Sequence, residues 1–200
     1  EFAKTRDIKK VTEEQWGEYV PEDLYGLSKF ITTEIVKQEP KMINLSLFGI
    51  YGPGEDYRYK FISNAIVKNL LGLPIKIKQD VVFDYLYVTD LMPVVEYFLT
   101  HESKYRDYNV STTDSIKLSE IVRIINKVSD EKSAVKIVKP GYNYQYTGDN
   151  KRLRQEIIDW KETDYVTGIQ KLFDYYLSII TTIDNKTVQN DEYFEKSKTK

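Results

Sequence analysis

The sequence predicts an α/β protein, because helical and strand-like segments alternate along most of its length. Apolar residues recur at helical spacing in several segments, and short runs rich in β-branched and aromatic residues stand between them. Glycine and proline mark many of the changes from one kind of segment to the next. With 200 residues, of which 41% are hydrophobic, the chain can form a real core, which argues against disorder over most of it.

The first predicted helix covers about residues 23–38. Four apolar residues recur in it at helical spacing: Leu24, Leu27, Ile31 and Ile35. Pro40 ends the segment, because the residue before a proline is disfavoured in helical geometry. Residues 1–20 are polar and lack a sustained period, so we expect a loop there with a short turn near 13–18.

A strand, a glycine-rich loop and a second helix follow in immediate succession. The apolar run 42–48 predicts a short strand, and the glycines and proline of 51–54 predict a turn or loop. Apolar residues on one side of 59–71 predict a helix, and Gly72 just after it is suited to a left-handed helix cap.

The same alternation continues to about residue 180. Strands are predicted at 75–77, 82–88, 108–110 and 134–138. Helices are predicted from a cap at Thr89 or Asp90 through 99, and at 118–128, 150–157 and 165–180. Residues 184–200 are polar, charged and almost without aliphatic side chains. We expect a flexible tail there.

Composition excludes several classes of protein and site. The formal net charge is −2 and the basic residues are scattered, so nothing resembles the basic surface of a nucleic-acid-binding protein. The sequence has no membrane-length apolar stretch, no secretory leader and no cysteine, which makes the cytoplasm the expected compartment. With no cysteine and only His101, we expect neither a metal site nor a histidine-containing triad, and we assign His101 no role. A small-molecule or protein partner fits this composition better than nucleic acid or a membrane.

Tyr25 and Lys29 are the candidates for chemistry. They are four residues apart on the first predicted helix, so their side chains share a face. A nearby cation stabilises the phenolate form of a tyrosine, which can then exchange a proton with a sugar hydroxyl or ketone while a hydride moves at the adjacent carbon. The spacing alone is not specific, because a chain with 17 tyrosines and many lysines contains such pairs by chance.

The surrounding motifs make the signal specific. Five ordered blocks carry it: Tyr25-Gly26-Leu27-Ser28-Lys29, Tyr51-Gly52-Pro53-Gly54, 83–90, Tyr108-Asn109-Val110 and 146–153. Over roughly residues 9–176 the sequence resembles the C-terminal portion of the extended short-chain dehydrogenase/reductase family. Within that family it is similar to the NAD-dependent epimerase/dehydratase group, which includes UDP-glucose 4-epimerase-like and GDP-L-fucose synthase-like enzymes of carbohydrate metabolism.

The resemblance implies a fold and a division into parts. The expected fold is the C-terminal part of a Rossmann-like, doubly wound parallel sheet with a smaller α/β substrate-binding lobe. Residues 1–58 would be the remnant of the NAD(P)-binding Rossmann domain, and 59–183 mainly the substrate-binding lobe with returning Rossmann elements. A homodimer that pairs through the Tyr-x-x-x-Lys helix is a further implication.

The resemblance also implies roles for individual residues. Tyr25 would be the catalytic acid/base, and Lys29 would both assist its deprotonation and hold the nicotinamide ribose of NAD or NADP. Leu47, Phe48 and Gly49 match the strand end that lines the nicotinamide pocket. The residues expected to bind a nucleoside-diphosphate sugar, whose diphosphate needs cations, are Arg58, Lys60, Asn64 and Lys68.

Three positions depart from the pattern of the family. Arginine is usual where Ser46 stands and common where Phe83 stands, and asparagine is frequent where Gly49 stands. Substrate contacts are therefore not carried over at these positions, and the nucleotide and the sugar stay open.

No glycine-rich, dinucleotide-binding turn precedes Tyr25, and the catalytic serine or threonine of the family would fall at or just before residue 1. We therefore expect a fragment that is inactive without an N-terminal half and that self-associates through exposed sheet surface. NAD versus NADP stays open, as does the choice among epimerase, dehydratase and reductase. Two other interpretations of the function remain: a non-catalytic binding or regulatory module, and the inactive product of a truncated gene.

Overall fold

The structure is a computed structural model that describes residues 6–18 and 20–199. Its elements fall into two compact units, each assembled from three stretches of the chain. Unit 1 contains residues up to 50 together with 83–115 and 144–162, and unit 2 contains 51–82, 116–143 and 163 onward. The chain thus passes repeatedly between the units.

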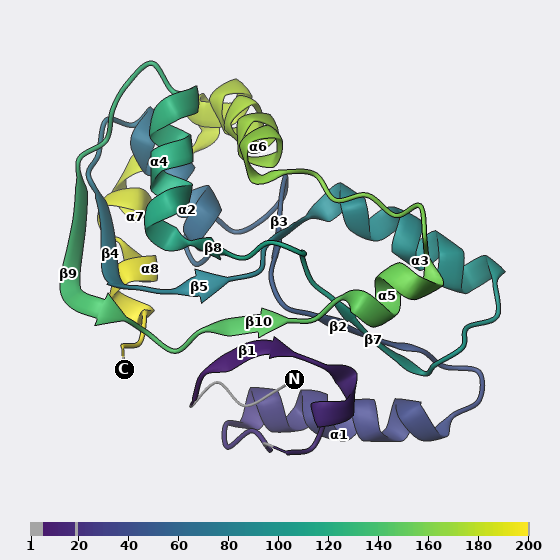
Figure 1. Ribbon diagram of the computed structural model, residues 1–200. Helices are drawn as coiled ribbons and strands as arrows, with labels where there is room; N and C mark the ends of the chain where they lie inside the picture. Colours follow the sequence, from purple (N-terminus) through teal and green to yellow (C-terminus); the bar gives the residue numbers. More distant parts are fainter. Residues whose placement is uncertain (1–5, 19, 200) are drawn as a thin grey trace. The chain divides into compact units, whose positions relative to one another are not determined.

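Parallel strands organise unit 1 (Figure 1). Strand β2 (Asn44–Leu47) pairs with β7 (Asp107–Val110), and β1 (Ile8–Val11) pairs with β10 (Tyr146–Gly148). On its other side β10 pairs with β5 (Val82–Phe83) through Tyr146 and Phe83. Strands β3 (Ile50–Tyr51) and β5 lie where the chain passes from one unit to the other, and β6 (Leu86–Tyr87) follows β5 closely.

The remaining elements of unit 1 are helices: η1 (Glu13–Gln15), α1 (Leu24–Gln38), η2 (Val88–Asp90), α3 (Leu91–Thr100) and α5 (Lys151–Glu156). The core of unit 1 is buried between strands and helices and consists of Leu86, Val94, Tyr108, Val110, Leu153 and Trp160. The Trp160 indole N–H donates to the carbonyl of Asp90 at 2.9 Å, so this buried polar group is satisfied.

Three helices pack together in unit 2, namely α2 (Phe61–Leu70), α4 (Leu118–Val128) and α6 (Tyr165–Ile179) (Figure 1). Nearly every side chain of α2 is buried. The other elements of unit 2 are β4 (Ile75–Asp80), β8 (Ile116–Lys117), β9 (Val135–Tyr142), η3 (Ile180–Thr182), α7 (Asn185–Gln189) and α8 (Glu192–Lys196). Strand β4 pairs in parallel with β9, and α7 and α8 contact α2 and β4.

Most predicted helices match the structure to within two residues at either end, and Gly72 has the left-handed φ of +68° expected of a helix cap. Three expectations differ from it. Residues 8–11, predicted as loop, form β1, whose partner β10 is far away in the sequence. The single strand predicted at 82–88 is broken into β5 and β6 around the buried Asp84. Residues 184–199, predicted as a flexible tail, contain α7 and α8 and bury Val188 and Asp191.

Candidate active site

The first turn of α1 carries Tyr25 and its second turn carries Lys29. The Asp23 carboxylate caps the helix by accepting the Gly26 N–H at 2.8 Å. A β-carbon at Gly26 would lie 2.6 Å from Cβ of Pro21, so only glycine fits against the incoming chain. Tyr25 is 63% exposed, and the Lys29 ammonium lies over its ring, 5.5 Å from the ring centroid. The structure thus brings the two side chains together, as their spacing predicts.

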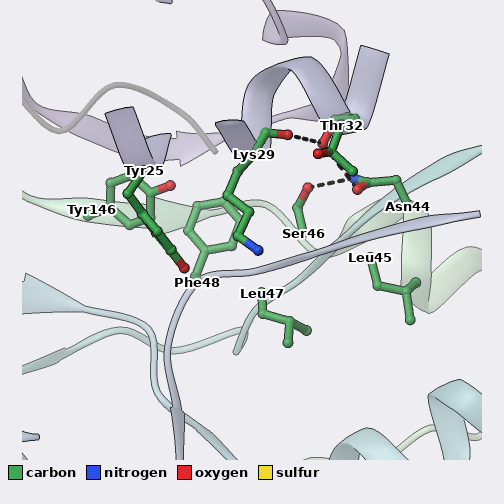
Figure 2. A pocket seen from close by; sticks show the side chains of 10 residues that line it. Tyr25, Lys29, Thr32, Asn44, Leu45, Ser46, Leu47, Phe48 and Tyr146 are labelled. Carbon is green, nitrogen blue, oxygen red and sulfur yellow. Dashed lines mark hydrogen bonds between the residues drawn. The ribbon is translucent and has the colours of Figure 1, made fainter. Parts of the chain in front are cut away.

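A pocket of about 330 Å³ opens beside this pair (Figure 2). It is built entirely within unit 1, from α1, from β2 with the residue after it, and from β10. Its lining residues are Tyr25, Lys29, Thr32, Thr33, Asn44, Leu45, Ser46, Leu47, Phe48 and Tyr146. Figure 2 shows the side chains of Tyr25, Lys29 and Phe48 directed toward one another across this pocket.

A hydrogen-bonded row of polar side chains joins α1 to β2 at the pocket. Thr33 Oγ1 is 3.1 Å from Asn44 Oδ1 and donates to it, and Asn44 Nδ2 donates to Ser46 Oγ at 2.9 Å. Ser46 stands where the family usually has arginine, so this wall of the pocket is polar and uncharged. The row therefore fixes the position of β2 relative to the helix that carries Lys29.

The opposite wall is aromatic. The rings of Phe48 and Tyr146 lie 5.2 Å apart between centroids, tilted by 40°. Leu47 and Phe48 line the pocket as expected of the nicotinamide strand end, but Gly49 does not. A β-carbon at Gly49 would lie 2.5 Å from the carbonyl oxygen of Asp84, so glycine is required there for close packing of two backbone segments. Tyr146 was not expected in the pocket, because its pairing through β10 is not visible in the local sequence pattern.

The residues expected to bind the nucleotide sugar are mostly occupied by partners within unit 2. Arg58 donates twice to the Asp56 carboxylate, at 2.9 and 2.7 Å, and Asn64 donates to the carbonyl of Tyr57 at 3.0 Å. Lys68 is 3% exposed and forms a buried ion pair with Asp191. Lys60, at the N-cap of α2, is exposed and forms no ion pair with any residue that the structure describes. Lys60 is thus exposed without an ion-pair partner among the described residues, whereas the other three side chains bind groups within unit 2.

Two buried acids have raised pKa values. Burial raises the pKa of Asp84, although its carboxylate accepts the Gly148 N–H at 2.8 Å and lies 3.5 Å from the Lys10 ammonium. Burial also raises the pKa of Glu55 to about 7, and this carboxylate accepts the Ser63 hydroxyl at 2.5 Å. Neither acid lines the pocket beside Tyr25.

The described residues contain neither a cluster of metal-binding side chains nor a membrane-length apolar helix. No group of three or more metal-binding side chains comes together within residues 6–18 and 20–199. Over the same residues, no helix has both the length and the apolar character to cross a bilayer. His101 is exposed at the end of α3 and stacks on the ring of Tyr97, with 4.4 Å between centroids.

The sequence matches a protein family and several characterised enzymes. The profile of the NAD dependent epimerase/dehydratase family matches residues 2–111. The chain is 24% identical over 185 residues to dTDP-glucose 4,6-dehydratase of Salmonella typhimurium, covering 84% of this chain and 51% of that protein. It is 28% identical over 187 residues to UDP-glucuronate 4-epimerase 4 of Arabidopsis thaliana, covering 79% of this chain and 42% of that protein. The chain thus spans about half the length of these curated relatives.

Solved structures share the fold. UDP-glucuronic acid 4-epimerase of Bacillus cereus, in complex with UDP-glucuronic acid and NAD, aligns with a TM-score of 0.73 at 18% identity, over 88% of this chain and 59% of that one. dTDP-glucose 4,6-dehydratase of Bacillus anthracis, in complex with NAD, aligns with a TM-score of 0.68 at 21% identity, over 88% and 58%. These similarities confirm the predicted fold class, a Rossmann-like α/β arrangement with parallel strands. With its matched profile and its shared fold, the chain belongs to the NAD-dependent epimerase/dehydratase family.

Proposed function

We propose that this chain supplies the acid/base pair, Tyr25 and Lys29, of an NAD(P)-dependent enzyme that acts on a nucleoside-diphosphate sugar. The observation that supports this most strongly is the pocket in which α1 sets the phenol and the ammonium side by side, facing the end of β2. A Tyr-x-x-x-Lys pair on a surface helix without such a pocket would support only a structural role.

The residues of the pocket fit one end of a dinucleotide cofactor. The space of about 330 Å³ suits a nicotinamide ring and its ribose, with Lys29 as the donor to ribose hydroxyls and Leu47 and Phe48 against the ring. When bound there, a nicotinamide cofactor accepts or donates a hydride at the carbon of the sugar that is oxidised or reduced.

The task of the protein side chains is proton transfer. In our proposal the Tyr25 phenolate oxygen takes the proton of a sugar hydroxyl as that carbon is oxidised, and the phenol so formed returns it when the carbonyl is reduced. The Lys29 ammonium lies beside this phenol, 5.5 Å from the centroid of the Tyr25 ring. The exposure of Tyr25 leaves its hydroxyl accessible to a substrate.

The proposed substrate class rests on the relatives, one a dTDP-glucose dehydratase and another a UDP-glucuronate epimerase. Of the four residues expected to bind it, only Lys60 remains in the proposal, since Arg58, Asn64 and Lys68 have partners within the chain. The exposed apolar side chains of α1, with Leu24 at 86%, Ile31 at 50% and Ile35 at 59%, support a dimer formed through this helix.

Substituting Tyr25→Phe in the full-length gene product tests the proposal. Turnover of a nucleoside-diphosphate sugar with NAD should fall by roughly 10²–10⁴-fold, as expected when a general acid/base is removed. Tyr105→Phe removes the hydroxyl of a half-exposed tyrosine outside the pocket and should leave turnover unchanged. Equal turnover by Tyr25→Phe and wild-type protein would show that Tyr25 is not the acid/base, and absence of turnover in both would favour a non-catalytic binding module.

A further inference from the structure

Gly148 lies at the end of β10, directly behind the aromatic wall of the pocket. A β-carbon at this position would lie 2.4 Å from Cε2 and 2.5 Å from Cζ of the Phe48 ring. Both distances are far below van der Waals contact, so one edge of the ring packs against the glycine backbone, where any larger residue would push the ring away. Gly148 thus provides the space that the Phe48 ring fills.

Hydrogen bonds at both the N–H and the carbonyl of Gly148 fix its backbone, so the backbone can shift little away from Phe48. Its N–H donates to the buried Asp84 carboxylate at 2.8 Å, and its carbonyl accepts the Ser111 hydroxyl at 3.0 Å. Asp84 is 1% exposed and lies 3.5 Å from the Lys10 ammonium, whose other acceptors are the carbonyls of Thr112 and Thr113. A side chain added at Gly148 therefore meets a fixed backbone on one side and a movable ring on the other.

The Phe48 ring lies between β10 and the pocket. Its neighbours on the β10 side are Gly148 and the buried ring of Tyr146, which is 6% exposed and packs with Ile8 and Val11. Its other side faces the pocket that it lines together with Tyr25 and Lys29 (Figure 2). Displacement of the ring from Gly148 would therefore fill the pocket.

We infer that Gly148 and Tyr146 are positioning residues, which keep the Phe48 ring against β10 so that the pocket beside Tyr25 and Lys29 stays open to a flat nicotinamide ring. This inference rests on the proposed function, because it assigns the pocket to the nicotinamide end of the cofactor. The inference gives β10 a part in shaping the cofactor pocket, although β10 follows the Tyr-x-x-x-Lys helix by more than a hundred residues in the chain.

The test compares the purified chain with four variants by titration with nicotinamide mononucleotide, followed by NMR. In Gly148→Ala the Phe48 ring should lose its nuclear Overhauser contacts to residue 148, and binding should weaken about tenfold or more, in keeping with the usual cost of overpacking. Phe48→Leu combined with Gly148→Ala should restore binding to within about threefold of Phe48→Leu alone, because leucine lacks the two ring atoms closest to the added methyl group. Gly168→Ala is the matched control, because its methyl group would meet the Tyr51 hydroxyl in unit 2, away from every lining residue of the pocket.

The outcomes separate the inference from the proposed function. Unchanged binding by Gly148→Ala, with the ring displaced, would overturn the inference and leave the proposed function standing. An undisplaced ring in Gly148→Ala would also overturn it. Failure of the wild-type chain to bind nicotinamide mononucleotide would count against the proposed cofactor pocket itself, and the inference would fall with it.

Discussion

The polar side chains of α1 and those around α2 differ in what they bind. Tyr25 and Lys29 on α1 are exposed, line a pocket and contact mainly each other. Arg58 and Lys68 are equally suited by charge to hold a diphosphate, but each is paired with an aspartate of the same unit. The first pair of side chains is thus available for a ligand, while each of the two cations around α2 already has a counter-charge within the chain.

The difference shows what decides whether a charged side chain is functional. Residue type and helical spacing support a ligand-binding role in both regions. Lys68 loses that role because Asp191 neutralises it from 123 residues further along the chain. Asp191 itself has a left-handed backbone with a φ of +51°, a conformation that a surrounding structure must hold in place.

The largest expected effect on stability follows from breaking this buried pair. Asp191→Asn tolerates the left-handed backbone but leaves the Lys68 ammonium buried without a counter-charge. The free energy of unfolding should fall by about 3 kcal/mol, as is usual when one partner of a buried pair is removed. Urea titration followed by circular dichroism measures the loss, and Asp130→Asn, at an exposed position, should cause none.

A second variant shows whether this cost arises from the unpaired ammonium. Lys68→Met added to Asp191→Asn removes the buried charge and should recover most of the lost stability. A double variant as unstable as Asp191→Asn alone would show that the lost stability does not come from the unpaired ammonium, and Lys68 would again be a candidate for binding substrate.

A smaller effect is expected from Glu55, in the loop before α2. Because burial raises its pKa from 4.5 to about 7, the folded protein holds this proton more tightly than the unfolded chain does. The resulting stability is complete below pH 4.5 and is lost as the pH rises through 7. Glu55→Gln cannot ionise and keeps an acceptor for Ser63, so at pH 8 it should be more stable than wild type by about 1–2 kcal/mol. Thermal unfolding at pH 5 and pH 8 tests this, and an equal pH dependence in the two proteins would contradict it.

The smallest effect is expected at Arg58. Its ion pair with Asp56 is nearly half exposed, and surface pairs of this kind contribute little to stability. Arg58→Ala should leave the urea midpoint unchanged while Asp191→Asn lowers it. A clear loss of stability in Arg58→Ala would mean that both cations hold the fold, and the contrast between a buried and an exposed pair would be lost.

Local patterns predicted much of this fold but not its long-range pairings. The helix bearing Tyr25 and Lys29 could be predicted because its apolar spacing and the following proline act within one segment. Strand β1 could not, because four residues with two lysines become a strand only by pairing with β10. The buried state of Lys68 likewise depends on a remote partner.

The candidate site likewise has residues that local motifs predict and residues that only long-range strand pairing places. The pairing of Tyr25 with Lys29 and the strand end at Leu47 and Phe48, which line one pocket, were predicted from motifs that are local in sequence. Tyr146 and Gly148 come to the pocket from a strand whose position is set by its parallel partners. Glycine at 148 carries no sequence signal of its own, because the requirement for it arises from the Phe48 ring.

The most direct measurement compares the reactivity of two lysines in one chain. Amine acetylation of the purified protein, quantified by peptide mass spectrometry, is carried out with and without saturating nicotinamide mononucleotide. We expect Lys29 to react readily in the free protein and to be protected by the ligand, and Lys68 to react slowly under both conditions because it is buried with Asp191. Unchanged reactivity of Lys29 with the ligand, or reaction of Lys68 as fast as that of Lys29, would contradict the account.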